Sequence, residues 1–549
     1  MISKVKIGIL HEGGSASEFQ REIIENLCQN SHYDVYWLKL HCNETTLNKV
    51  QRKISDQGLY SLVSDVIFKF YEKIEKIILC KLSSQLCKTW DMEDFSFTDF
   101  LDIQYSIGKY NSCYINSSSI INIDKLKLDF LYRSSGGGIF KGDVLKTSKY
   151  GIISLHHGDN NWNRGGPPGF WEVYYRTPVT GFIIQILNST LDGGKVLRRG
   201  WIRTQRYFSA NRREISIAAN RELLQIFVEF ANNRDQLREF EKPTRIFDGI
   251  ILRNPTGVSL LIYLIKLFYR DTVKVFERFV LRRRHNWQIG YQATSWAGAD
   301  LRRSCVLKPP RNHFYADPFI CKLDDKVCIF YEDYNYSNKK GKISCSEVTK
   351  DGEVTKYEDL LKLTTHQSFP FIFECDTGLY MVPETRESRN IQLFKCRKFP
   401  ADWVKVKDIF TDIDAVDTVI FNKGGIWWMM TTTADDPLSK ADSKLRCFTT
   451  DNAISGDWVE HPASPLLNDP LIGRNGGLLY NWGEIYRVSQ TPGFQHYGKS
   501  CCIWKINIEE YDISFNKVQS VHPNFGNKVK SIHHLHGNED LFTFDYELK

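Results

Sequence analysis

The second half of the sequence repeats one pattern five times, and this repeat limits the fold more than any other feature. Each copy is a run of β-forming residues, a short turn and a second run. Matching positions lie roughly fifty residues apart, which is typical of a β-propeller with one blade per repeat. Because a sandwich would not repeat one hairpin at constant spacing, we predict a five-bladed β-propeller over residues 291–549. The matching positions are 318, 370, 418, 476 and 532.

The first part of the chain, residues 1–240, alternates strand and helix patterns. Residues 5–10 form a β-like run before Gly13 and Gly14, Ser17 begins a helix that extends to about residue 28, and residues 34–38 read as the next strand. Residues 128–132 and 151–155 resemble further strands. Strand, glycine turn, helix and strand in this order predict an α/β domain with a parallel, Rossmann-like sheet. Residues 42–110 show no clear pattern.

Residues 241–290 are predicted to be a helical connector between the two domains. Apolar residues recur at helical spacing from Val258 to Val280, and Arg282, Arg283 and Arg284 follow. Such an amphipathic helix either packs one domain on the other or lies on a membrane surface, so peripheral membrane contact through residues 258–284 stays open. We favour domain packing, because an apolar face of this width suits it.

Composition and charge exclude several classes of protein. The 549 residues are too many for one ordinary domain, and 42% hydrophobic with 25% charged residues is normal for a globular chain. No uncharged apolar run is long enough for a transmembrane helix. A net charge of +7 is small for this length, so no nucleic-acid partner is expected. The cysteines show no zinc-ligand spacing, so no metal is predicted.

The absence of a signal-peptide pattern and the scattered cysteines favour a cytoplasmic protein with reduced thiols. The sequence does not indicate an oligomeric state.

The segment 154–172 is the most informative part of the first domain. A predicted strand ends at His156, and a polar loop rich in glycine and proline follows it. Ligand sites in parallel sheets lie outside the carboxyl ends of the strands. Asp192 lies on a glycine-flanked turn after another predicted strand, and together with His156 it would form a proton-transfer pair. Alternatively, His156 only ends a strand and Asp192 only caps a turn.

This segment resembles the formyltransferase family, which includes methionyl-tRNA, glycinamide ribonucleotide and sugar N-formyltransferases. The resemblance rests on the order of His156, Arg164-Gly165, Pro168, Thr180-Gly181 and Asp192-x-Gly194. It covers residues 120–200 well and residues 4–40 weakly. It implies an acyl transfer in which His156 stabilises the oxyanion and Asp192 orients His156 while an amine attacks the formyl carbon.

One residue departs from the family pattern. The family has asparagine where this chain has Ser154, and that asparagine holds the formyl oxygen as the oxyanion forms. Loss of such a donor costs about 2.7–4 kcal/mol. Either His157 or Asn160 replaces it, or the chemistry has changed. The polar loop, with Arg164, is also the segment that we expect to meet a polar substrate.

The same resemblance implies formyl-tetrahydrofolate as the donor co-substrate. The folate would lie over the loop of Gly136, Gly137 and Gly138, with Arg133 as a nearby contact that is as well explained by a structural role.

The repeat region resembles the five-bladed propellers of arabinanases and levansucrases, and more closely those of glucosamine inositolphosphorylceramide transferase-like proteins. The residues that carry this resemblance are 313–319, 383–385, 416–418 and 497–498. In the hydrolases two aspartates and a glutamate act as base, pKa modulator and acid, and Asp317, Asp417 and Glu384 lie where such groups would. First-strand aspartates also tie propeller blades together, so we favour sugar binding over hydrolysis.

Three functions remain open on the sequence. The one we favour is an N-formyltransferase acting on an amino sugar, free, nucleotide-linked or in a glycan or glycolipid, with the propeller holding the acceptor. The second is a propeller glycoside hydrolase or glycosyltransferase with a degenerate first domain. The third is a non-catalytic binding protein.

Overall fold

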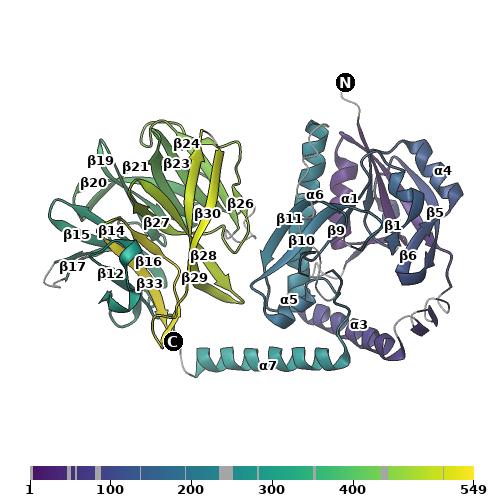
Figure 1. The fold of residues 1–549 in the computed structure, drawn as a ribbon, viewed down its shortest axis with the longest axis horizontal. Helices are drawn as coiled ribbons and strands as arrows, with labels where there is room; N and C mark the ends of the chain where they lie inside the picture. The colour runs from purple at the N-terminus through teal and green to yellow at the C-terminus, as the bar shows by residue number, and fades with distance from the viewer. Residues whose placement is uncertain are drawn as a thin grey trace. The chain divides into compact units, whose positions relative to one another are not determined.

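The chain divides into two compact units, residues 1–275 and 276–549, each described here by itself (Figure 1). The structure is a computed structural model. It describes all residues except 1–3, 46–47, 49–50, 53, 56–57, 81–87, 137, 163, 192, 234–250, 281–283, 350–353, 435–442 and 511.

The first unit is built on one nine-stranded mixed sheet with the order β11-β10-β9-β7-β1-β3-β5-β6-β8. Five neighbouring strands, β9, β7, β1, β3 and β5, run parallel. A small sheet pairs β2 with β4. The strands are β1 (Val5–Glu12), β2 (Ser15–Ser17), β3 (Tyr33–Cys42), β4 (Thr89–Asp91), β5 (Asp99–Gly108), β6 (Ser112–Ile115), β7 (Phe130–Arg133), β8 (Ile139–Phe140), β9 (Ile152–His156), β10 (Val179–Ile186) and β11 (Lys195–Arg203).

The helices of this unit are α1 (Glu18–Gln29), α3 (Leu59–Cys80), α4 (Ser117–Leu126), α5 (Phe170–Tyr175), α6 (Phe208–Asn232) and α7 (Gly257–Phe279), of which α7 continues past residue 275. The predicted start of the first helix is confirmed: the Ser17 backbone N–H donates to the Gln20 side-chain Oε1 at 2.8 Å before α1. Among the residues that the structure describes, no helix is long and apolar enough to cross a membrane.

The second unit is all β and has five blades, so the predicted fold class is confirmed. The blades are β14 (His313–Leu323) to β17, β18 (Ser368–Cys375) to β21, β22 (Ala415–Lys423) to β26, β27 (Asn475–Asn481) to β30, and a fifth from both ends of the unit. Their remaining strands are β15 (Lys326–Asn335), β16 (Lys340–Val348), β17 (Val354–Tyr357), β19 (Gly378–Glu384), β20 (Asn390–Lys398), β21 (Asp402–Thr411), β23 (Ile426–Thr433), β24 (Lys444–Thr450), β25 (Val459–Glu460), β26 (Leu467–Asn468), β28 (Glu484–Gly493), β29 (His496–Glu509) and β30 (Asp512–Val521).

The fifth blade closes the ring by joining the two ends of the propeller. From the C-terminal side come β31 (Val529–Ser531), β32 (Leu535–Gly537) and β33 (Phe542–Leu548), and from the N-terminal side β12 (Trp287–Gln292) and β13 (Cys305–Leu307). Strand β12 pairs antiparallel with β33 along its whole length. The predicted boundary at residue 291 therefore lies inside β12. The first strands of the propeller belong to its last blade, and their sequence does not show the pattern of the first repeat.

The inner strands of the first four blades carry the same irregularity. Their pairing registers shift between Ala316 and Phe319, between Ser368 and Phe371, between Val416 and Val419, and between Asn475 and Leu478. Each shift is a β-bulge followed by a fully buried apolar residue of the common core. The structural equivalent of positions 318, 370 and 418 is therefore Gly477 and not residue 476.

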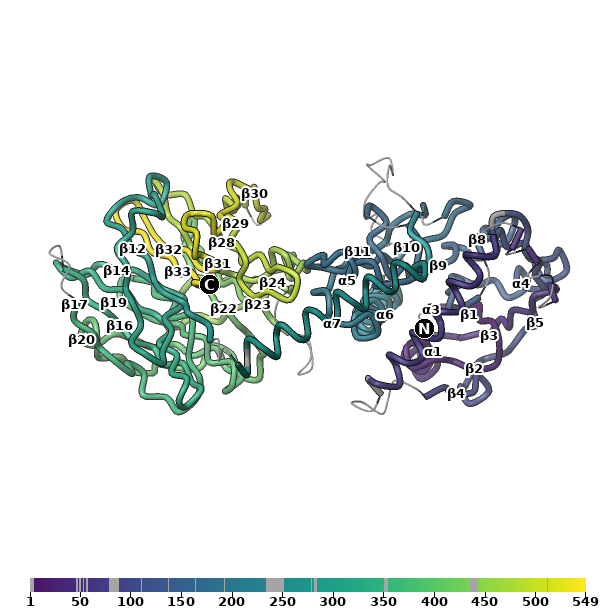
Figure 2. Tube along the Cα trace, turned by 90° about the horizontal axis from the view of Figure 1, so that it is seen from below, coloured from purple at the N-terminus to yellow at the C-terminus, as the bar shows by residue number. Residues whose placement is uncertain are grey.

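The predicted connector contributes α7 to the first unit. Figures 1 and 2 place α7 beside α3 and α5. Tyr263 of α7 meets the ring of Tyr71 at 5.9 Å, and Lys266 Nζ donates to the Tyr174 carbonyl at 3.3 Å. Residues 241–250 and 281–283 of the connector lie outside the described residues.

Ring closure by β12 generates a first prediction. A fragment of residues 284–549 should unfold cooperatively, whereas a fragment of residues 293–549 should show a Tm lower by more than about 10 °C or no cooperative transition. The shorter fragment loses the partner of β33 and the buried side chains of Trp287 and Ile289. Calorimetry of both fragments, with residues 276–549 as the control that keeps β12, measures this. Equal Tm values for all three would contradict it.

Candidate functional site

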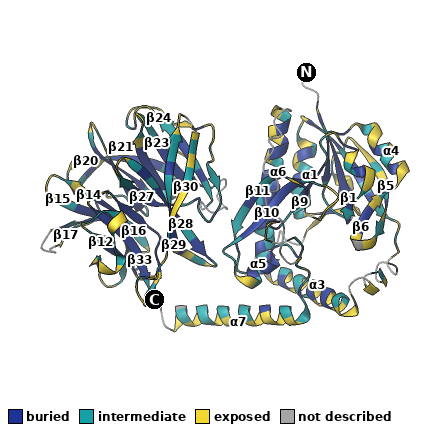
Figure 3. Cartoon of the chain, in the orientation of Figure 1, coloured by how far each residue is buried: buried dark blue, intermediate teal, exposed yellow. Residues whose placement is uncertain are grey.

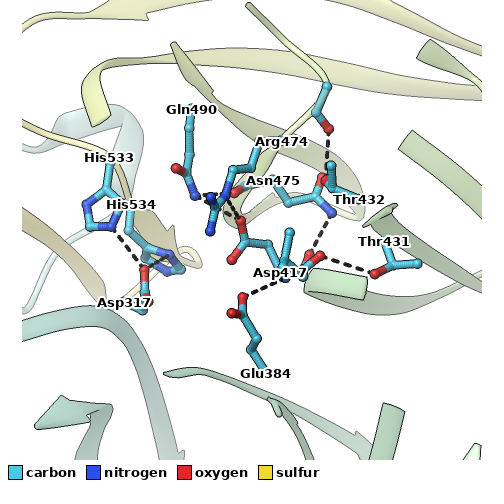
Figure 4. Close-up of polar contacts among 12 residues, drawn as sticks. Asp317, Glu384, Asp417, Thr431, Thr432, Arg474, Asn475, Gln490, His533 and His534 are labelled. Carbon is cyan, nitrogen blue, oxygen red and sulfur yellow. Dashed lines mark hydrogen bonds and ion pairs between the residues drawn. The ribbon is translucent and has the colours of Figure 1, made fainter. Parts of the chain in front are cut away.

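Acidic side chains gather with Arg474 and two histidines, His533 and His534, at the inner strands of the propeller. Figure 4 shows Asp317, Glu384 and Asp417 among them, and Glu332 and Asp545 belong to the same centre. Asp317 and Asp417 lie on the bulges of the first and third blades, both with left-handed backbones at φ of 51° and 52°. Non-glycine residues rarely adopt this conformation, and bulges of this kind re-aim side chains beside binding sites. The bulges therefore explain why these two aspartates turn toward one centre while their strands continue into the core.

Asp417 is held by four neighbours. Its carboxylate forms an ion pair with Arg474 and accepts from Gln490 Nε2 at 3.1 Å. Its backbone carbonyl accepts from Asn475 Nδ2 at 2.8 Å, and its backbone N–H donates to Glu384 Oε2 at 3.3 Å. Burial raises the pKa of Asp417 while Arg474 opposes that rise. The Arg474–Asp417 pair is thus a fixed, charge-compensated part of the centre.

Asp317 is held by a histidine that bridges two aspartates. His533 Nδ1 lies 2.8 Å from Asp545 Oδ1, and its Nε2 lies 3.3 Å from Asp317 Oδ1. Burial alone would lower the pKa of His533, but the charges of Asp545 and Asp317 raise it to about 10. The imidazole is therefore a cation at neutral pH and uses both ring nitrogens for this bridge.

Two glutamates complete the acidic centre. Burial, and then the charge of Asp417, raise the pKa of Glu384 to about 8 against the opposing charge of Arg474. Burial, with the charges of Asp317 and Glu384, raises the pKa of Glu332 well above its usual range. At pH 7 the centre thus combines protonated and ionised carboxyl groups, which is the arrangement that acid–base chemistry requires.

Asp317, His533 and Asp545 also lie close enough together to hold a metal ion. A metal would need a neutral His533, because a protonated ring nitrogen has no lone pair to donate. The two carboxylates hold His533 in its cationic form, and its ion pairs with Asp545 and Asp317 join the three groups without a metal. The donor set therefore fits the bridge better than it fits a cation.

The sequence pattern located Asp317, Glu384 and Asp417 but missed the groups that neutralise them. Arg474 and His533 lie within two residues of the matching positions of the fourth and fifth repeats, so alignment of the repeats could have found them. Tyr497 contacts both, with its ring 5.1 Å from the Arg474 guanidinium and 5.2 Å from His533, and it stays 39% exposed. A partly exposed aromatic ring beside buried carboxylates is typical of sugar sites.

In the first unit, Ser154 and His156 occupy the carboxyl end of β9, as predicted. Ser154 pairs in register with Arg133 of β7 and Gln185 of β10, and it is buried. The Gln185 side-chain Oε1 accepts from the Gly194 backbone N–H at 3.2 Å. Asp192 lies outside the described residues, and the bond attaches Gly194 to the strand beside Ser154. Sequence reasoning missed Gln185 because it belongs to another strand.

The loop residues expected to meet a substrate are engaged within the loop. Asn160 Oδ1 accepts from Arg199 Nη2 at 3.0 Å, and Arg164 Nε donates to the Asn160 carbonyl at 3.0 Å. Burial, with the charges of His156 and Arg212, lowers the pKa of His157 to about 3. His157 Nε2 has no hydrogen-bond partner among the described residues. These contacts give Asn160 and Arg164 a role in shaping the loop, and they leave His157 neutral.

The glycine-rich loop is explained by packing within the chain. A Cβ on Gly138 would lie 1.7 Å from the Asn111 carbonyl oxygen, and one on Gly136 would lie 2.5 Å from Glu12 Cβ. Arg133 Nε donates to the Gly136 carbonyl at 3.1 Å, which gives Arg133 a structural role. Gly137 lies outside the described residues. The loop therefore adds no support for a folate site.

The raised pKa of Glu384 generates a second prediction. Between pH 4.5, the ordinary value of the carboxyl, and about 8, the folded state keeps a proton that the unfolded state has released. Raising the pH through this window therefore lowers the free energy of unfolding, by at most about 1.4 kcal/mol per pH unit. Urea unfolding of Glu384→Gln should show a smaller decline, because only the contribution of Glu332 remains. Glu358→Gln, at a 68% exposed side chain, is the control and should keep the full decline. Identical pH profiles for the two variants would contradict the assignment.

Comparison with known proteins relates the propeller to one group of transferases. Residues 299–540 match the family model described as "Glucosamine inositolphosphorylceramide transferase 1, N-terminal". The glucosamine inositolphosphorylceramide transferase 1 of Arabidopsis thaliana is 30% identical over 210 residues, which are 36% of this chain and 27% of that protein. The chain thus spans about a quarter of the length of the curated relatives it matches.

Two solved structures resemble parts of the chain distantly. The catalytic domain of Coprinopsis cinerea GH62 α-L-arabinofuranosidase is 10% identical with a TM-score of 0.34, covering 48% of this chain and 97% of that domain. Glycinamide ribonucleotide transformylase 1 from Symbiobacterium toebii is 11% identical with a TM-score of 0.27, covering 42% and 89%. The region from residue 299 to 540 is therefore similar to a transferase family, while formyl transfer stays a prediction.

Proposed function

We propose that the protein is a transferase of carbohydrate metabolism whose propeller centre binds an amino sugar, such as glucosamine or a glycan or glycolipid that contains it. The observation that carries the proposal is the acidic centre, where five carboxyl groups lie around Arg474 and His533, with Arg386 near Glu384. The similarity of residues 299–540 to glucosamine inositolphosphorylceramide transferases supports the choice of sugar.

The charge balance of the centre favours a cationic ligand. Arg474 and His533 supply two positive charges against the three carboxylates of Asp317, Asp417 and Asp545, so ionising Glu384 and Glu332 adds further uncompensated negative charge. An ammonium group placed among them would favour the ionised carboxylates and offset this repulsion. Tyr497 supplies a ring face on which a sugar can stack. A neutral sugar would gain the stacking but not the ion pair.

This proposal generates a third prediction. At pH 7 the full-length protein should bind glucosamine but bind N-acetylglucosamine at least about tenfold more weakly, because acetylation removes the charge. Binding should release up to one proton, because the ligand lowers the pKa of Glu384. Calorimetry in buffers of different ionisation enthalpy measures both quantities.

Two variants sharpen this test. Glu384→Gln should weaken glucosamine binding roughly tenfold to a hundredfold and remove the proton release, since an uncharged amide replaces the carboxyl. Glu358→Gln, outside the centre, should change neither. Equal affinity for glucosamine and N-acetylglucosamine would overturn the amino-sugar proposal.

Besides binding a sugar, the acidic centre could catalyse the cleavage or transfer of a glycosidic bond. A protonated Glu384 beside ionised carboxylates could donate a proton to a leaving oxygen. However, Asp417 is already paired with Arg474, and the fourth blade carries Gly476 and Gly477 on its bulge where the first and third carry aspartates. This arrangement favours holding the sugar over breaking its bond.

Formyl transfer at the first unit is a second candidate, favoured by the arrangement of Ser154, His156 and Gln185. In this reaction the amine nitrogen bonds to the formyl carbon, the bond from that carbon to the donor nitrogen breaks, and the amine loses a proton. His156 would move that proton, and the carboxamide of Gln185, beside Ser154, would supply the donor that the family places at position 154.

A fourth prediction tests this candidate with formyl-tetrahydrofolate and an amino sugar. His156→Ala should lower turnover at least about a hundredfold. Gln185→Leu should lower it by a similar factor, and Ser154→Asn in the same chain should restore part of the activity by returning a carboxamide to the site. Gln225→Leu, an exposed change on α6, is the control. Full turnover by a folded His156→Ala protein would overturn formyl transfer at this site.

A further inference from the structure

Helix α3 is inverted: it turns its polar side chains toward the protein and its apolar ones outward. Asp65 accepts from Asn254 Nδ2 at 2.8 Å, Glu75 accepts from the Ser209 backbone N–H at 2.8 Å, and Glu72 pairs with Arg212. An ordinary surface helix places its apolar stripe against the core. The packing of α3 therefore depends on buried hydrogen bonds and ion pairs together with the buried ring of Phe68, which contacts Phe170 and Phe208, while most of its other apolar side chains are exposed.

Helix α7 repeats this inversion over the part that belongs to the first unit. Asp271 accepts from Arg206 Nε at 2.9 Å and from the Tyr207 hydroxyl at 3.0 Å. Arg270 Nη2 donates to the Arg206 carbonyl at 2.9 Å, and Lys266 reaches Tyr174. Only Leu260 and Tyr263 of α7 are buried apolar contacts in its first three turns.

The outward sides of the two helices form an apolar surface, which we call the α3/α7 face. It is defined by Val63, Val66 and Phe70 of α3 and by Leu261, Ile265 and Phe268 of α7. Phe70 is 67% exposed and Phe268 is 74% exposed. Figure 3 shows exposed residues along both helices. Apolar side chains at these spacings on two adjacent helices form a surface larger than isolated exposed residues, and such surfaces mark interaction sites.

Two lysines border the part of the α3/α7 face that α3 contributes. Lys69 and Lys73 of α3 are exposed beside Phe70, while Asp65, Glu72 and Glu75 of the same helix point inward. Long lysine side chains place their stems along apolar surface and their ammonium groups in water. The face therefore presents apolar side chains bordered by cations, which is the pattern of helices that lie in a membrane interface.

We propose that the α3/α7 face binds the surface of a lipid bilayer that contains anionic lipids. The apolar side chains would enter the boundary between head groups and acyl chains, and Lys69 and Lys73 would pair with anionic head groups. The hydrogen bonds and ion pairs of both helices lie on the side that faces the protein. They therefore stay intact when the opposite, apolar side enters the lipid. The proposal is independent of the sugar specificity of the propeller.

A fifth prediction tests this proposal by sedimentation of the full-length protein with vesicles. The protein should partition into phosphatidylcholine vesicles that contain phosphatidylglycerol and much less into phosphatidylcholine alone. Phe70→Glu with Phe268→Glu should lower partition at least about a hundredfold, because two aromatic side chains leave the lipid. Lys69→Gln with Lys73→Gln should lower it about thirtyfold for anionic vesicles only.

Controls separate lipid binding from unfolding and from self-association. Val459→Glu with Val518→Glu changes two exposed propeller residues and should leave partition unchanged. Near-ultraviolet circular dichroism of every variant checks folding. Absence of partition by the native protein would overturn the proposal, as would a dimer in light scattering that Phe70→Glu with Phe268→Glu dissolves while vesicle binding is absent.

Discussion

Backbone pairing of β12 with β33 is the constraint on which the propeller depends. It joins residues 287–292 to residues 542–547 and closes the five blades into a ring. A propeller blade buries its apolar faces only against its neighbours, so an open ring would expose both sides of the gap. Closure also brings the start of every inner strand to one axis. Side chains more than two hundred residues apart, such as Asp317 and Asp545, meet there for this reason.

The bulges convert this closed ring into a site. A regular strand would turn Asp317 and Asp417 by strict alternation, whereas the extra residue in each bulge turns them toward the centre and returns the next residue to the core. The charges that gather there are compensated in pairs by Arg474 and His533, and the carboxyl groups left over take up protons instead. The raised pKa of Glu384 is therefore a consequence of its burial and of the neighbouring carboxylate of Asp417.

The first unit uses polar contacts in an unusual place. Helices α3 and α7 are attached through Asp65, Glu72, Glu75 and Asp271, so the residues that would normally form a core are outside. The amphipathic sequence pattern of these helices, taken alone, predicts the opposite orientation, because the apolar stripe of a surface helix usually faces the core. The expectation that residues 258–280 dock one domain on the other followed that rule, and only the contacts of Asp271 and Lys266 show which side of α7 faces the protein.

The sequence by itself determined what local pattern encodes: the repeat of hairpins, the parallel strands before and after α1, and the types of residue at the ends of inner strands. Asp317 and Asp417 lie at equivalent positions of the repeat, and together with Glu384 they were predicted from the resemblance to propeller hydrolases. Tertiary structure alone decided what depends on residues far apart in the chain. The ring closes through β12, His533 bridges Asp317 and Asp545, and Gln185 stands beside Ser154 because strands distant in sequence pair in one register. Such pairings leave no periodic pattern in the sequence, since each depends on which strand edges meet after the sheets have formed.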